Sequence, residues 1–418
     1  MNMKRNMAQP AAHIVATPRS LHAAAERGSP DGWLDWLLSL PVLGVGTIVS
    51  FLSVAVAMRD MARDSGAFQW SPARLLGQHV DPWLTYLSGD PQHRIILSQF
   101  PNYLHELYVL LLPFGYISFA HAKIIWALIN LALAVVSCTC IVRFYELGGR
   151  KAWLFFILVF SSTPMRVSIA TGEFAVLELT CLALWGLARS SGSRGVLLGI
   201  AYSKYSVPPV LGAFLAMRRR WRLLLYSLLP VGIGFVVSHA MLPTSALRLL
   251  FEPFRVATSG NVDAGIANVM AVSEPTLSHD SAYRSVHPLS TSHLPYACAI
   301  LLALAIAGYL FRHGRNVDGR ILLACLTASG LVCFPHAIYD FLLLAFCLAV
   351  GLAARHGIPR TLVVVGVCYF WYGQRIGHIL NLELWRPFIV VSFAVLLTLI
   401  AATWKARDAT YWNEHWDI

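Results

Sequence analysis

Charged residues are scarce in this sequence: only 13% of its 418 residues are Asp, Glu, Lys or Arg, whereas 57% are hydrophobic. A soluble domain usually carries about 25% charged residues, which cover its surface. So few charges exclude a soluble enzyme, a disordered chain and a coiled coil. The apolar runs are long and lack the short alternating segments of a membrane barrel, so the sequence predicts an integral membrane protein built of helices.

Other signals are also missing. Basic residues outnumber acidic ones, 32 to 21, but no basic stripe carries interleaved aromatic residues, so no nucleic-acid partner is expected. The eight cysteines lie in apolar segments without CxxC spacing, which argues against a disulfide framework. His279, His287 and His293 match no zinc signature. We therefore expect no metal site.

What the sequence does have is apolar runs long enough to cross a bilayer, which takes about 20 residues. Lys204 and Pro208-Pro209 interrupt residues 195–217, so we expect two half-helices that enter the membrane and return. The run 104–117 is expected to dip in without crossing. The fold class is an all-α polytopic membrane protein with about ten transmembrane helices plus re-entrant segments. The expected spans lie near residues 33–58, 122–142, 152–165, 173–188, 221–242, 294–311, 321–335, 337–354, 361–374 and 385–404.

Lysine and arginine residues set the expected orientation, because they concentrate on the cytoplasmic side of a membrane. With these spans, most of the 32 basic residues are cytoplasmic, and so are both termini. The expected organisation is a cytoplasmic tail at 1–32, a transmembrane domain at 33–404 and a second tail at 405–418. Two long stretches face outward: a first outer loop at 59–121 and a second outer loop at 243–293.

Asp60 and Asp64 open the first outer loop, four residues apart. On a helix they would share one face at the membrane surface. Arg74 lies close in sequence and would hold a carboxylate ionised or bind a phosphate. On spacing alone, a solvated helix at the membrane surface whose charges pair with one another is the favoured interpretation.

Charges inside apolar segments are more informative, because each costs about 2.5 kcal/mol or more at depth and such residues tend to be functional. Glu173 and Glu178 begin the fourth expected span, and Lys204 occupies the break in the hairpin. Asp340 follows His336 by one helical turn. Two structural alternatives stay open: Lys204 pairs with Glu178 or Asp340, or His336 is bonded to backbone at a helix end.

Taken in order along the chain, several motifs resemble glycosyltransferase family 87, polytopic enzymes of the GT-C superfamily. The similarity covers roughly residues 60–345. The matching motifs are Ala73-Arg74-Leu75-Leu76-Gly77, Asp81-Pro82-Trp83, Ala122 through Leu131, Gly172-Glu173 where the family often has Gly-Gln, Lys204-Tyr205-Ser206-Val207-Pro208, Arg218 through Arg222, and His336 with Tyr339-Asp340.

In one place the chain departs from the family pattern. The family's aspartate would stand immediately before Phe68, where this chain has Ala67. Either the carboxylate has moved to Asp64 or Asp60, or the site is altered.

The resemblance implies a GT-C-like fold and an inverting glycosyltransferase that needs no metal or cofactor. It would move a hexose, mannose-like by preference, from a polyprenyl-phosphate donor to a glycan or glycolipid acceptor. The site would face the periplasm from a bacterial inner membrane. Asp64 or Asp60 would deprotonate the acceptor hydroxyl. The residues expected to bind the donor phosphate and sugar are Arg74, Lys204, His336, Glu173 and Asp340.

Two other functions fit the residues. One is a transporter or flippase for a lipid-linked sugar, with Glu178, Lys204 and Asp340 as a relay, although no inverted repeat is evident. The other is an inactive scaffold of a polysaccharide assembly complex, which Ala67 would explain.

Overall fold

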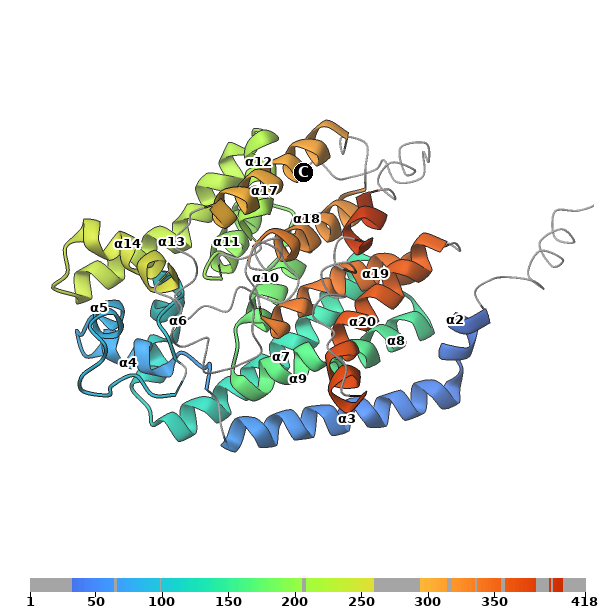
Figure 1. Ribbon diagram of the computed structural model, residues 1–418, viewed down its shortest axis with the longest axis horizontal. Helices are drawn as coiled ribbons and strands as arrows, with labels where there is room; N and C mark the ends of the chain where they lie inside the picture. The colour runs from blue at the N-terminus through green and yellow to red at the C-terminus, as the bar shows by residue number, and fades with distance from the viewer. Residues whose placement is uncertain are drawn as a thin grey trace, which may run out of the picture.

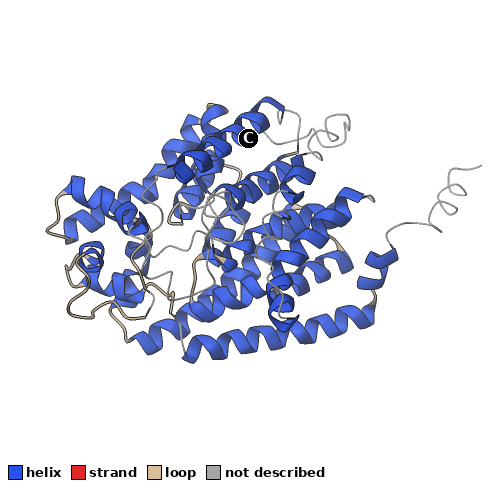
Figure 2. Cartoon of the chain, in the orientation of Figure 1, coloured by secondary structure: helices blue, strands red, loops and turns tan. Residues whose placement is uncertain are grey.

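The structure, a computed structural model, describes residues 32–63, 66–97, 99–204, 208–258, 294–313, 318–334, 337–354, 358–380, 391 and 394–400. Every regular element in these residues is helical (Figure 2). The all-α class predicted from the apolar runs is therefore confirmed.

Three helices in the described residues are long and apolar enough to cross a membrane: α3 (Leu40–Arg63), α7 (Phe119–Phe144) and α13 (Trp221–Met241). At 1.5 Å per residue each spans the roughly 30 Å hydrocarbon core. Large apolar side chains such as Phe51, Leu128 and Ile233 are exposed on them, as expected of surfaces that face lipid. The chain is a membrane protein, and the predicted number of about ten spans stays a prediction.

A bent pair of helices forms either a fourth span or a re-entrant loop. Helices α8 (Gly149–Ser161) and α9 (Thr163–Thr171) together qualify as a span, with a 51° bend between them. Ser162 is extended and its side chain accepts the Met165 amide, so it caps α9. Pro164 follows and suits the first turn of a helix, where its missing N–H is not needed. The span predicted at 152–165 covers α8 and the start of α9, and the bend lies between them.

Most of the remaining helices are shorter, although α17 has 20 residues and α20 has 23, and they pack with the three long helices in one bundle (Figure 1). The expected hairpin at 195–217 is divided into two helices, α11 and α12, as predicted, and Lys204 stands in the break between them. The remaining helices of the bundle are α10 (Ala175–Leu187), α11 (Ser191–Ala201), α12 (Pro208–Met217), α17 (Leu294–His313), α18 (Gly319–Cys333), the 3₁₀ helix η3 (Ile338–Leu344), α19 (Ala345–Ala353) and α20 (Ile358–Leu380). The short α2 (Gly32–Leu37) precedes α3.

Helix α11 approaches α13 unusually closely because of two glycines. A Cβ added at Gly195 would lie 2.6 Å from the Leu223 carbonyl oxygen, and one added at Gly199 would overlap the Ser227 carbonyl oxygen. Small residues spaced four apart allow such backbone contact between helices in lipid, where van der Waals packing rather than hydrophobic exclusion drives association.

Four short helices gather at one end of the molecule, at the left of Figure 1: α4 (Trp70–Gly77), α5 (Pro82–Leu87), α6 (His105–Gly115) and α14 (Ala246–Thr258). We call this region the outer lobe. It has a core of its own, which includes Phe68, Trp83, Tyr108 and Trp126. Parts of both predicted outer loops therefore meet in one body.

Candidate active site

The break between α11 and α12 places Lys204 inside the protein. Its ammonium group forms a salt bridge with the carboxylate of Asp340, and the two residues are only 7% and 2% exposed. Asp340 lies in the first turn of η3, where its other oxygen accepts the Ala337 amide at 2.9 Å. The structural alternative that pairs Lys204 with Asp340 is thus realised.

Glu173 is brought to the same region by a sharp turn between α9 and α10. Gly172 adopts the left-handed conformation, with φ 79°, which ends α9. The buried carboxylate of Glu173 accepts a hydrogen bond from the Tyr103 hydroxyl at 2.8 Å and another from Tyr339. It also interacts electrostatically with Lys204.

Glu178 adds a third carboxyl group. It lies on the first turn of α10, is 2% exposed, and neither carboxylate oxygen has a hydrogen-bond partner among the described residues. Both Lys204 and Asp340 interact with it electrostatically. An uncompensated buried polar group is costly, so its retention beside an ion pair marks this place as a candidate functional site.

These groups form what we call the lysine cluster: Tyr103, Glu173, Glu178, Lys204, Tyr339 and Asp340. The Lys204 ammonium lies 4.2 Å from the centre of the Tyr339 ring, a cation–π contact. One positive charge therefore faces three carboxyl groups and two phenols. Such a set can bind a phosphate through the lysine and remove a proton through a carboxylate.

The chain that follows α3 runs alongside the lysine cluster. The Ala67 amide donates a hydrogen bond to the Thr171 carbonyl at 3.1 Å. Phe68 packs against Gly172 so closely that a Cβ there would lie 2.6 Å from the Phe68 Cβ. Position 67, where the resemblance expects a carboxylate, is thus beside the turn that carries Glu173.

The other predicted site residues lie elsewhere or outside the described part. Asp60 is 40% exposed and pairs with Arg59 at 2.8 Å, as the self-paired alternative predicts. Arg74 is exposed on α4, and its guanidinium lies 4.9 Å from the centre of the Trp70 ring. Asp64 and His336 lie outside the described residues.

Tyr103 is the member of the cluster that sequence reasoning missed. It follows Pro101-Asn102 in an irregular segment, seventy positions before its partner Glu173. No local spacing could reveal that contact. The only signal is indirect: a tyrosine hydroxyl needs a partner when it is buried, and Tyr103 is 5% exposed.

Polar groups also join the two outer stretches within the outer lobe. Asp81 caps α5 by accepting the Leu84 amide at 2.9 Å, and it accepts the Thr244 hydroxyl at 2.5 Å. Glu252 on α14 is fully buried near Asp81 and accepts from Arg248 at 3.0 Å. Burial, together with the Asp81 carboxyl, raises the pKa of Glu252 to about 7.

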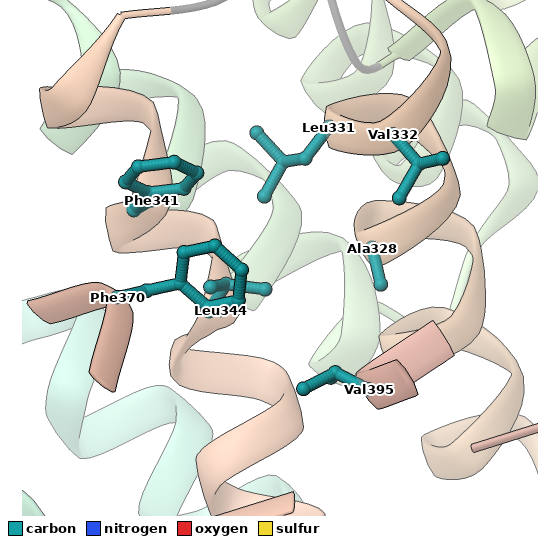
Figure 3. Close-up of a pocket in the computed structure, with 7 residues that line it drawn as sticks. All are labelled: Ala328, Leu331, Val332, Phe341, Leu344, Phe370 and Val395. Atoms are coloured by element: carbon teal, nitrogen blue, oxygen red, sulfur yellow. The ribbon is translucent and has the colours of Figure 1, made fainter. Parts of the chain in front are cut away.

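Two cavities are of interest among the described residues. One, between α18, η3 and α20, is apolar and measures only about 10 Å³, room for one water molecule (Figure 3). The other is a pocket of about 410 Å³ in the outer lobe, with Tyr86, Asp90 and Phe100 in its wall. Only the second is large enough for a substrate group.

Comparison with known proteins gives one match. The model of glycosyltransferase family 87 matches residues 107–335, more than half of the chain. The matched segment contains Glu173, Glu178 and Lys204 of the lysine cluster. Neither a curated protein nor a solved structure matches significantly.

Proposed function

Because this chain belongs to glycosyltransferase family 87, and is therefore a membrane-embedded glycosyltransferase, we propose the particular reaction that it catalyses. The donor is a polyprenyl-phosphate hexose, mannose-like by preference. The acceptor is a glycan or glycolipid at the periplasmic face of a bacterial inner membrane. The observation that supports this proposal best is the lysine cluster, which offers one buried cation and several carboxyl groups within an apolar helical bundle.

The chemistry suits these groups. The acceptor oxygen attacks the anomeric carbon, its proton passes to a carboxylate, and the bond between that carbon and the phosphate oxygen breaks. The phosphate leaves with the bonding electrons, so it needs no general acid, unlike the leaving group in glycoside hydrolysis. Lys204 stabilises the growing charge on the phosphate, because a cation in a water-poor site interacts strongly with developing charge.

Three carboxylates are candidates for the base. Asp64 and Asp60 are those that the resemblance implies, with Arg74 and His336 as further phosphate-binding groups. Glu173 is a third candidate, because it lies in the lysine cluster and beside Ala67. A single substitution of each distinguishes them.

The experiment is transfer of labelled hexose from synthetic polyprenyl-phosphate donors by the purified protein in lipid nanodiscs. Wild type is compared with Asp64→Asn, Asp60→Asn, Glu173→Gln and His336→Ala. We expect one carboxylate variant to lose at least about 100-fold in kcat, the lower end for general-base catalysis, while it still binds donor. Asp35→Asn is the matched control, because Asp35 is an exposed carboxylate on α2, far from the outer lobe (Figure 1).

A folded wild type that neither consumes nor binds any donor of this class would overturn the proposal. The second candidate, a flippase for a lipid-linked sugar, would then gain weight, because Glu178, Lys204 and Asp340 are indeed brought together. It predicts movement of the lipid-linked sugar across vesicle membranes without any acceptor, and loss of that movement in Glu178→Gln.

A further inference from the structure

The outer-lobe pocket is large enough for a sugar ring, and the reaction proposed above makes no use of it. Its volume of about 410 Å³ falls within the range of roughly 300–1,000 Å³ typical of small-molecule sites. We propose that it binds a pyranose ring of the acceptor, as a recognition subsite separate from the reacting centre. That the bound sugar belongs to the acceptor rests on the proposed function. That the pocket binds a sugar does not.

The lining of the pocket has the chemistry of a sugar site. Tyr86 and Phe100 stand with ring centres 5.4 Å apart and planes inclined at 57°, so they offer faces in two directions. The faces of aromatic rings are negative, and they attract the weakly positive C–H groups on one face of a pyranose. Leu97 is 56% exposed and extends the apolar wall.

Asp90 supplies hydrogen-bond acceptors for sugar hydroxyls. Its two oxygens accept the amides of Arg94 and Ile95 at 3.0 and 2.8 Å. A carboxylate can accept about four hydrogen bonds, so about two positions remain. These two hydrogen bonds from backbone amides hold the Asp90 carboxylate in place at the wall of the pocket. Less conformational entropy is then lost when a sugar binds.

The pocket is held in shape before any ligand arrives. Asp90, His93 and Leu97 all have left-handed φ values, between 45° and 52°, which costs energy for a residue such as leucine. Ser71 on α4 restrains this loop: its hydroxyl accepts the Ile96 amide at 3.2 Å, and its amide donates to the Gln99 side chain at 2.7 Å. A strained loop with its own restraints is consistent with a preformed binding site.

The pocket is also tied to the lysine cluster through the chain. Phe100 in its wall precedes Tyr103 by three residues, which span at most about 11 Å when extended. Tyr103 donates its hydroxyl to Glu173 at 2.8 Å. One short segment therefore carries both a wall residue of the pocket and a hydrogen-bond donor of the cluster.

The test measures binding directly, without donor and without turnover. The probes are octyl glycosides of mannose, glucose and galactose, and octyl tetraethylene glycol ether as a probe with the same tail but no sugar. Binding to the full-length protein in nanodiscs is followed by saturation-transfer NMR below the micelle concentration. The variants are Tyr86→Ala and Asp90→Asn, the latter because asparagine tolerates the left-handed conformation. Tyr116→Ala is the control, because Tyr116 is a 70% exposed tyrosine outside the pocket lining.

We expect at least one glycoside to bind, with affinity reduced about tenfold or more by Tyr86→Ala and Asp90→Asn and unchanged by Tyr116→Ala. The ether should not compete. If the ether binds as well as the glycosides, the pocket holds an alkyl chain and the proposal is wrong. It is equally wrong if no glycoside binds, or if Tyr86→Ala leaves binding unchanged. Because hexose transfer is assayed separately, failure of this subsite and failure of the proposed reaction give different results.

Discussion

Lys204 is the residue on which the candidate site depends, because three carboxyl groups face its single ammonium group. Removing one member of a buried ion pair leaves an uncompensated charge, which typically costs about 3–5 kcal/mol. Lys204→Met would leave all three carboxyl groups without their cation. Asp340→Asn would leave Lys204 with Glu173 and Glu178. We therefore expect Lys204→Met to lower the thermal unfolding temperature in detergent more than Asp340→Asn does.

The double variant Lys204→Met/Asp340→Leu is the control for this prediction. It removes the pair as a unit, so the two substitutions should be less than additive. A larger loss in Asp340→Asn than in Lys204→Met would contradict the assignment of Lys204 as the shared partner.

A second residue, Glu252, should make the stability of the outer lobe depend on pH. The pKa of this carboxyl is raised from 4.5 to about 7 by burial and by Asp81, and Arg248 only partly opposes the rise. Because its pKa is raised, this carboxyl binds a proton more tightly in the folded protein than in the unfolded chain. Its contribution to stability is therefore complete below about pH 4.5 and is lost as the pH rises through 7. His105, which bonds to the Leu249 carbonyl of α14, stays neutral in this window because burial lowers its pKa to about 4.

We therefore expect the amides of α14 to exchange hydrogen faster, after correction for the intrinsic rate, as the pH rises from 5 to 8. Hydrogen-exchange mass spectrometry at several pH values measures this. Glu252→Gln should flatten the dependence, since glutamine does not titrate. An equal slope in wild type and variant would show that another group controls the docking of α14.

At the scale of the elements, the contact between α11 and α13 depends on glycine. A side chain at Gly199 would press on the Ser227 carbonyl and on the Pro230 ring, and overpacking of this kind costs about 1–3 kcal/mol. Gly199→Ala should therefore lower the unfolding temperature, although alanine favours a helix by about 1 kcal/mol. Gly232→Ala on α13 is the matched control, because nothing lies within 4 Å of its Cβ position. Equal stability of the two variants would exclude close packing as the reason for Gly199.

The sequence predicted elements well where a local signal exists. Lys204 and Pro208-Pro209 interrupt an apolar run, and the chain does divide there into α11 and α12. The bend at Ser162 was not predicted, because apolar composition continues through it and only a serine cap and Pro164 mark it. Glu173, Glu178, Lys204 and Asp340 were recognisable individually, since a charge in an apolar run is costly. The sequence left open whether Lys204 pairs with Glu178 or Asp340, and it gave no sign that Glu173 and Tyr103 join the pair, because that depends on how distant segments pack.

At the scale of the whole molecule, the outer lobe and the basic helix ends give a prediction of sidedness. Helix α7 has 26 residues, about 39 Å at 1.5 Å per residue, so its two ends lie on opposite sides of a bilayer. It begins at Phe119, beside the outer lobe, and ends near Arg143, followed by Arg150 and Lys151. Basic residues favour the cytoplasmic side, so we expect the lobe, with its pocket and the nearby cluster, on the periplasmic side.

Two variants, each with one cysteine added to the native eight, test this orientation in intact cells with a membrane-impermeant maleimide. Gln92→Cys lies in the exposed loop of the outer lobe, and Gly148→Cys lies in the exposed connection after α7. Gln92→Cys should react in intact cells, whereas Gly148→Cys should react only after permeabilisation. The wild type gives the background, and the seven described native cysteines are buried or half-buried. The reverse labelling pattern would place the outer lobe in the cytoplasm. An acceptor at the periplasmic face could not reach it there, so the reaction proposed for the periplasmic face would be wrong.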